Sequence, residues 1–87
     1  MSRIEQMRSL LTTLAPTHIE IIDESHLHAG HEGARSGGGH YTLDIVSTQF
    51  SGKATLARHR MIYSALGEMM KHDIHALNIK AYTPQEL

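Results

Sequence analysis

An amphipathic helix between two strand-like segments is the feature that most constrains the fold of this chain. From Ala54 to Lys71, apolar side chains recur at helical spacing and form one stripe. The stripe consists of Leu56, Ile62, Tyr63, Ala65, Leu66, Met69 and Met70. Alternating patterns from His40 to Ser47 and from Ile74 to Tyr82 predict β-strands on either side of the helix. A strand–helix–strand unit joins parallel strands by a right-handed crossover, so we expect these two strands to pair in parallel.

The segment before this unit predicts one more helix and one more strand. Ser2 to Leu14 carries a core-facing apolar stripe and begins with the capping-box pattern Ser2-x-x-Glu5. His18 to Asp23 reads as a strand, expected antiparallel to the second strand. The predicted order is therefore αββαβ, an α+β fold in which both helices cover one face of a small three-stranded mixed sheet. A chain of 87 residues is expected to form a single domain over residues 1–87.

Composition narrows the classes of function. The chain has no cysteine, so it contains neither a disulfide, nor a thiol nucleophile, nor a cysteine-ligated metal of its own. Its formal net charge of −1 argues against polyanion binding by bulk charge. It lacks an apolar run near the roughly 20 residues that span a bilayer, and its first residues lack a signal-peptide pattern. We expect a soluble cytoplasmic protein without a membrane partner, and no catalytic constellation predicts an enzyme.

Histidines concentrate in the loop of residues 24–39, which joins the first two strands. The pattern His26-x-His28-x-x-His31 places three imidazoles within six residues. The predicted topology starts the last strand at the same end of the sheet, which brings His75 near this loop. Neutral imidazole is a good ligand for iron, zinc and copper, and long loops in compact domains are often functional. The sequence therefore indicates a candidate metal site at this end of the sheet.

A simpler interpretation of these histidines also stands. Loop histidines are commonly ordinary polar surface residues, and the alternation of the last strand places His75 on its apolar face. That face consists of His75, Leu77, Ile79 and Ala81. There, His75 would be a half-buried histidine with a hydrogen-bond partner. The glycines Gly37–Gly39 are interpreted as a source of backbone freedom, because they lack the phosphate-binding pattern that opens a helix after a strand.

A basic cluster marks the opposite end of the predicted domain. Lys53, Arg58 and Arg60 lie near the start of the central helix, which as one piece would be about 27 Å long. Such a cluster suits nucleic-acid phosphates, although it is equally the solvated flank of a helix. His59 projects into the apolar stripe, so we expect a structural role, with a ring nitrogen bonded inside the domain.

An ordered set of motifs resembles the signature of the BolA family. The set comprises Phe50-x-Gly52-Lys53-x4-Arg58-His59-Arg60, then Ile74-His75-Ala76-Leu77, and Asp23-Glu24-Ser25 before the glycine- and histidine-rich loop. The resemblance runs from about Ile4 to Pro84. It implies a fold similar to class II KH domains.

The same resemblance implies a partner and a cofactor. BolA proteins pair with monothiol glutaredoxins and share a [2Fe–2S] cluster, to which the glutaredoxin cysteine and glutathione supply sulfur. The family's ligands then match His75 and, in the loop, His28, with His31 as the runner-up. We expect no cofactor in the isolated chain, which would be a monomer or a weak homodimer.

Two functions follow from the resemblance and the residues together. The first is iron–sulfur trafficking or redox regulation with a monothiol glutaredoxin. The alternative is a DNA-binding transcriptional regulator that would use Lys53, Arg58 and Arg60. KH domains clamp nucleic-acid backbone with a Gly-x-x-Gly loop, and the turn Ser51–Thr55 lacks the second glycine.

Overall fold

The structure, a computed structural model, describes residues 1–25 and 38–87. The helices are α1 (Arg3–Leu11), α3 (Thr55–Leu66) and α4 (Met69–His72), and the strands are β1 (His18–Asp23), β2 (Gly39–Val46) and β3 (Ile74–Tyr82). Short 3-10 turns follow α1 (Thr12–Leu14), β2 (Thr48–Phe50) and β3 (Pro84–Glu86). The predicted αββαβ order is confirmed. The loop histidines His26, His28 and His31 lie outside the described residues.

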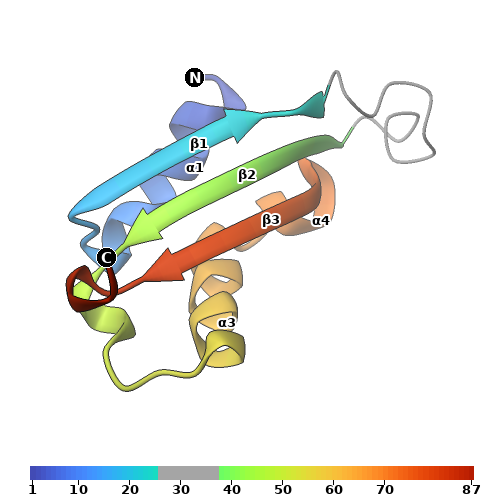
Figure 1. Ribbon diagram of the computed structural model, residues 1–87. Helices are drawn as coiled ribbons and strands as arrows, with labels where there is room; N and C mark the ends of the chain where they lie inside the picture. The colour runs from blue at the N-terminus through green and yellow to red at the C-terminus, as the bar shows by residue number, and fades with distance from the viewer. Residues whose placement is uncertain (26–37) are drawn as a thin grey trace.

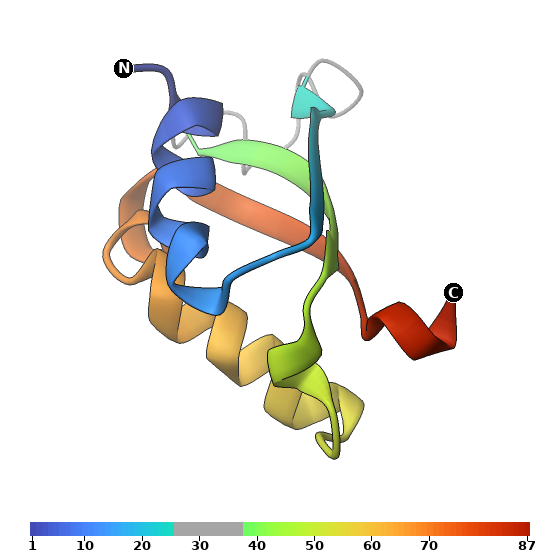
Figure 2. The same ribbon diagram turned by 90° about the vertical axis from the view of Figure 1, so that its left-hand side faces the viewer.

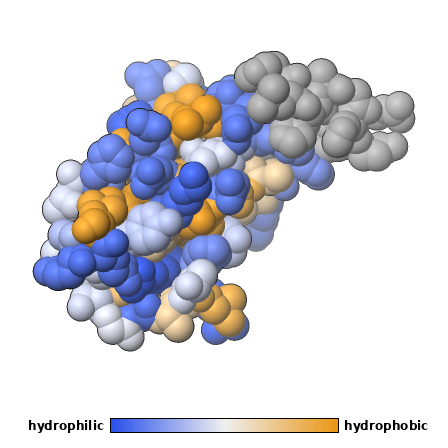
Figure 3. Space-filling view, viewed as in Figure 1, coloured by the Kyte–Doolittle hydropathy of each residue, from blue (hydrophilic) through white to orange (hydrophobic). Residues whose placement is uncertain are grey.

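Strand β2 lies at the centre of the sheet. It pairs antiparallel with β1 and parallel with β3, which confirms the predicted mixed sheet. Figures 1 and 2 show that α1, α3 and α4 all lie on one side of the strands. No described helix covers the other face, where Figure 3 shows mostly hydrophilic side chains with hydrophobic ones interspersed. No helix among the described residues has the length and apolar character needed to cross a membrane.

The core lies between the helices and the covered face of the sheet. Its fully buried or nearly fully buried side chains are Met7, Leu11, Leu43, Ile45, Phe50, Ile62 and Leu66. The first helix begins as predicted: the Ser2 hydroxyl accepts the Glu5 amide at 3.1 Å, and the Glu5 carboxylate accepts the Ser2 amide at 3.1 Å. This reciprocal capping satisfies two donors at the start of α1.

The central helix is shorter than the sequence pattern predicted. A single helix from Ala54 to Lys71 was expected, but α3 ends at Leu66 and α4 begins at Met69. Gly67 separates them with φ of +53°, a left-handed conformation that glycine adopts at little cost. Periodicity alone does not reveal this break, because Met69 still returns to the core side.

Two apolar side chains of α3 also lie largely outside the core. Leu56 and Tyr63 were expected in the buried stripe, but they are 62% and 41% exposed. In Figures 1 and 2 the beginning of α3 extends past the strands, so no layer covers it. The N-cap is Ala54, and no side chain caps this end of the helix.

An arginine from a helix reaches each outer edge of the sheet. Arg8 of α1 donates to the Ile19 carbonyl of β1 at 3.4 Å, and Arg58 of α3 donates to the Ala81 carbonyl of β3 at 3.0 Å. The Tyr82 carbonyl accepts the Ser47 amide on the β2 side, so the preceding Ala81 carbonyl faces outward. Side chains that occupy outward carbonyls hinder the addition of a further strand.

Ser47 is a buried polar link between the end of β2 and the turn after α1, and it generates a stability prediction. Its hydroxyl donates to the Leu14 carbonyl at 2.5 Å and accepts the Gln49 amide at 3.1 Å, while the side chain is fully buried. Ser47→Ala should lower the free energy of unfolding by about 1–3 kcal/mol, because buried polar groups lose their partner. Urea denaturation measures the change. Thr48→Ala, at an exposed neighbour, is the control and should stay within about 0.5 kcal/mol of the wild type; equal stabilities of the two variants would contradict the assigned role.

Candidate functional site

His75 is the extra residue of a β-bulge. Gly39 of β2 pairs with Ile74 of β3, but the next residue, His40, pairs with Ala76. One step on β2 therefore matches two steps on β3, which is the definition of a bulge. Ile74 is buried in the core, and His75 is exposed. The expectation that His75 shares the apolar face of the strand is wrong, because the bulge breaks the alternation at this residue.

The bulge brings His75 against a second histidine. The ring centroids of His40 and His75 are 5.1 Å apart and their planes are inclined by 40°. We call these two residues the histidine pair. His40 is 9% exposed, and its amide donates to the Ser25 hydroxyl at 3.0 Å. His40 was not among the site residues predicted from the sequence, although the parallel pairing of the predicted strands would have placed it beside the start of β3.

The residues before the undescribed part of the loop fix the position of His40. The Ser25 amide donates to the Asp23 carboxylate at 2.9 Å, and the Glu24 amide donates to the His40 carbonyl at 2.8 Å. The Glu24 carboxylate accepts a hydrogen bond from the hydroxyl of Thr42. This polar network accounts structurally for the Asp23-Glu24-Ser25 motif: it holds the neighbouring backbone at the histidine end of the sheet.

Two glycines allow the close packing of this end. A Cβ atom on Gly38 would lie 2.8 Å from the Cβ of His75, and one on Gly39 would lie 2.6 Å from the ring of Tyr41. Contacts this short force neighbouring atoms to move. Gly37–Gly39 were expected to provide backbone freedom; at Gly38 and Gly39 the observed requirement is instead the absence of a side chain.

The histidine pair offers two imidazole rings to a metal centre. Within residues 1–25 and 38–87, no group of three or more His, Cys, Asp or Glu side chains is placed to hold an ion. A pocket of about 370 Å³ adjoins the pair and is lined by Glu24, His40, Tyr41, Ala76, Leu77 and Asn78. The predicted ligand His75 is thus accessible, while His28 and His31 are not among the described residues.

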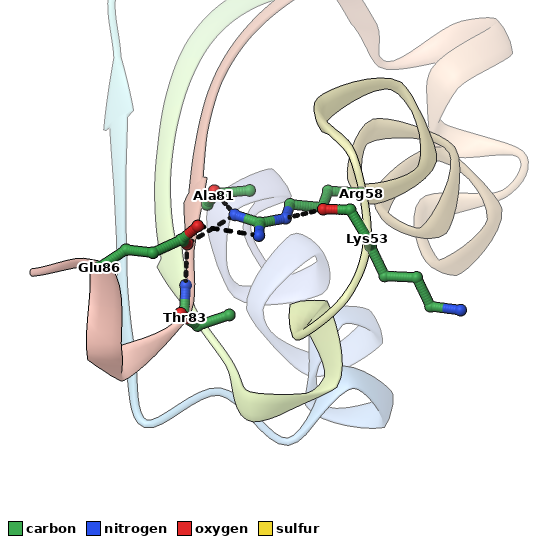
Figure 4. Close-up of polar contacts among 5 residues, drawn as sticks. All are labelled: Lys53, Arg58, Ala81, Thr83 and Glu86. Carbon is green, nitrogen blue, oxygen red and sulfur yellow. Dashed lines mark hydrogen bonds and ion pairs between the residues drawn. The ribbon is translucent and has the colours of Figure 1, made fainter.

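At the other end of the sheet, Arg58 is engaged inside the domain (Figure 4). Its Nε donates to the Lys53 carbonyl at 2.8 Å, and its terminal nitrogens donate to the two Glu86 carboxylate oxygens at 2.7 and 3.0 Å. Together with the bond to Ala81, these contacts join the turn before α3, the end of β3 and the Pro84–Glu86 turn. Hydrogen bonds from Arg58 first, and then from the Thr83 amide, lower the pKa of Glu86 from 4.5 to about 2.

The other two cations of the basic cluster face solvent. Lys53 is exposed, and Figure 4 shows its side chain directed away from Glu86. Arg60 is exposed and borders a groove of about 720 Å³ between α1 and α3. The floor of this groove is apolar and consists of Leu10, Leu14, Met61 and Ala65. Lys53 and Arg60 are therefore available to an external anion.

His59 lies between these two environments. It is half-buried, and its ring meets the ring of Tyr63 edge-on at a centroid distance of 6.4 Å. The ring makes no hydrogen bond to any residue of the described ranges 1–25 and 38–87, so the expected internal partner is not found there. The reason is the position of the first half of α3, which extends beyond the sheet and leaves His59 at the rim of the core.

The two candidate sites lie at opposite ends of β3. His75 is its second residue and Ala81, which binds Arg58, is the last but one. They are six residue steps apart along the extended strand, a distance of about 20 Å. The predicted separation of a histidine end and a basic end is therefore observed.

Comparison with known proteins gives one consistent family. A family model described as BolA-like protein matches residues 10–86. The DNA-binding transcriptional regulator BolA of Escherichia coli is 39% identical over 84 residues, which cover 97% of this chain and 75% of that protein. SufE-like protein 1 of Arabidopsis thaliana, named as chloroplastic/mitochondrial, is 43% identical over 79 residues. The match covers 85% of this chain and 21% of that protein, so the chain spans about a fifth of its length.

Solved structures agree with these relatives. The BolA domain of SufE1 from Arabidopsis thaliana superimposes with a TM-score of 0.87 at 42% identity, covering 100% of this chain and 98% of the other. BolA1 from the same plant gives a TM-score of 0.85 at 35% identity, with the same two coverages of 100% and 98%.

The contact of Gly38 with His75 generates a prediction about the site. Gly38→Ala should displace His75 and weaken the contact between the two imidazole rings, because the new methyl group would occupy the space of the His75 Cβ. Ring cross-peaks between His40 and His75 in NMR spectra measure this contact. Gly39→Ala is the matched control: it should disturb the ring of Tyr41 and lower stability instead. Unchanged histidine cross-peaks in the Gly38 variant would refute the packing role.

Proposed function

The chain belongs to the BolA family, and on that basis we propose that it is an iron–sulfur trafficking or redox-regulatory partner of a monothiol glutaredoxin. The supporting observation is the histidine pair, with His75 exposed at the end of the sheet. In this proposal the glutaredoxin cysteine and glutathione supply sulfur to a shared [2Fe–2S] cluster, and histidines of this chain supply the remaining ligands. We propose no catalytic activity.

The donor set of the chain fits such a shared site. Imidazole is a ligand of iron, and replacing two thiolates by two imidazoles raises the reduction potential of a [2Fe–2S] centre. The chain has no cysteine, so it depends on the partner for sulfur. When bound, the cluster supplies one-electron chemistry and transferable iron and sulfide. Protonation of imidazole competes with ligation, which makes the cluster labile in acid.

In this proposal, some residues of the chain are cluster ligands and others orient those ligands. His75 is exposed and approachable by a partner, so it is the first ligand in the proposal. The second ligand is His28, with His31 as the runner-up, and the observed ring contact adds His40 as a further candidate. The Ser25 hydroxyl and the bare Cα of Gly38 orient the pair, as outer-shell groups orient metal ligands.

Reconstitution with the partner tests this proposal. The chain is mixed with a monothiol glutaredoxin, iron, sulfide and glutathione, and visible absorption and circular dichroism are recorded. A spectrum distinct from that of the glutaredoxin homodimer is expected, and His75→Ala should abolish the difference. His72→Ala, which removes an exposed imidazole from α4, is the control and should leave the spectrum unchanged.

The same experiment identifies the second histidine ligand and can also contradict the proposal. His28→Ala, His31→Ala and His40→Ala are compared, and the variant with the greatest spectral loss identifies the ligand. If the mixture with the wild-type chain gives only the spectrum of the glutaredoxin homodimer, cluster sharing by this chain is wrong.

A second candidate function, DNA binding, is favoured by the basic end of the domain. Helix α3 contains no acidic residue, and Lys53 and Arg60 are exposed at its beginning. The relative from Escherichia coli is named as a DNA-binding transcriptional regulator. With so few exposed cations, we expect few phosphate contacts and therefore a modest affinity that falls with salt.

Charge removal tests the second function. Lys53→Ala combined with Arg60→Ala should weaken binding to a labelled DNA duplex and flatten the salt dependence by about 0.9 unit of log–log slope per lost phosphate contact. Fluorescence anisotropy at several salt concentrations gives both quantities. His75→Ala, about 20 Å away along β3, is the control and should bind as the wild type does. A loss of affinity in the His75 variant but not in the double variant would contradict this assignment.

A further inference from the structure

The carboxylate of Glu86 occupies an anion-binding site formed by this chain. The two terminal nitrogens of Arg58 bind its oxygens at 2.7 and 3.0 Å, and the Thr83 amide donates to it at 2.7 Å. Three donors thus converge on one carboxylate, as Figure 4 shows. We propose that Glu86 is an internal competitor at a phosphate site, so that the Pro84–Glu86 turn restrains the binding of nucleic acid at the basic end. This inference rests on the second candidate function.

The receiving side of the site is held in place without Glu86. The Arg58 side chain is 12% exposed, and two of its donors are fixed by the backbone carbonyls of Lys53 and Ala81. Phe50 lies beside the guanidinium, with its ring centroid 6.0 Å from the central carbon. The guanidinium group of Arg58 therefore keeps its orientation when the Glu86 carboxylate is displaced. A guanidinium fork accepts two oxygens of a phosphate in the same geometry as two oxygens of a carboxylate.

The Pro84–Glu86 turn, which carries the carboxylate, is less firmly packed than Arg58. The Pro84–Glu86 turn contains no buried residue, and the Glu86 side chain is 43% exposed. Its carboxylate is held by the bonds to Arg58 and by the capping bonds with Thr83. No hydrophobic anchor has to be removed to displace the carboxylate. An external anion can therefore exchange with Glu86 without opening the core.

The surrounding charges favour nucleic acid over an acidic protein surface. Lys53 adjoins Arg58 through its carbonyl, and Arg60 lies on the same helix. Displacement of Glu86 leaves three cations at one end of the domain, with no acidic residue in α3. Regularly repeated phosphates engage several separated cations at once, whereas one acidic side chain engages only the fork.

Binding of a labelled random-sequence DNA duplex to the full chain tests the competition. Glu86→Gln should bind about three- to tenfold more tightly than the wild type in 50 mM salt, with the salt slope steeper by about 0.9, which is one more phosphate contact. Glu20→Gln, which removes the same charge from an exposed position on β1, is the matched control and should show neither change. Arg58→Lys in the Glu86→Gln background should lose the gain in affinity, because lysine has no guanidinium fork.

Two further checks accompany these variants. Glu86→Ala should bind DNA as tightly as Glu86→Gln if the effect follows from loss of the carboxylate. Circular dichroism of every variant checks that the chain is folded.

The remaining outcomes separate the inference from the function on which it rests. Equal gains in the Glu86 and Glu20 variants indicate a bulk charge effect and overturn the inference. If the Lys53/Arg60 double variant loses affinity while Glu86→Gln binds as the wild type, the second function stands and the competition is wrong. If neither the wild type nor Glu86→Gln binds DNA, both the competition by Glu86 and the DNA-binding function are wrong. A gain by Glu86→Gln for polyglutamate but not for the duplex overturns the proposed class of ligand.

Discussion

The parallel pairing of β2 with β3 is the constraint on which the rest of the structure depends. Because the strands run the same way, the connection through α3 and α4 must return the chain to the end of the sheet where β2 began. This return places Ile74 beside Gly39 and brings His75 to His40. The same pairing sends the other end of β3 toward the beginning of α3, where Arg58 meets Ala81. One topological fact therefore creates both ends of the molecule.

Much of this arrangement is predictable from the sequence, and what is not has physical reasons. Strand alternation and helical spacing reveal the element order, and the crossover rule then gives the direction of β3. The bulge at His75 is invisible to an alternation rule, because it arises from the register between two strands. The exposure of Leu56 likewise depends on tertiary structure. Leu56 belongs to the helical apolar stripe, but the beginning of α3 extends past the edge of the sheet, where there is no strand to cover it. Gly67 signals a break only when its positive φ is known.

The family signature around Arg58 combines residues with different tasks. Successive residues of a helix are about 100° apart, so Arg58, His59 and Arg60 face three directions. Arg58 turns inward and joins three segments, His59 stays at the rim, and Arg60 faces the groove with α1. A run of neighbouring cations in a sequence is therefore not one surface patch. Within the basic cluster, Lys53 and Arg60 are exposed, and Arg58 has a structural role while Glu86 remains bound.

The arginines at the two sheet edges affect how such a domain behaves when it is part of a larger protein. A three-stranded sheet with free edges would tend to merge with any strand of a covalently attached neighbour. Arg8 at Ile19 and Arg58 at Ala81 close part of each edge with groups that belong to the sheet's own helices. We therefore expect such a domain to keep its boundaries when it is joined to a larger polypeptide. The matching region of the Arabidopsis SufE-like protein, about a fifth of that chain, shows that a similar domain occurs within a longer polypeptide.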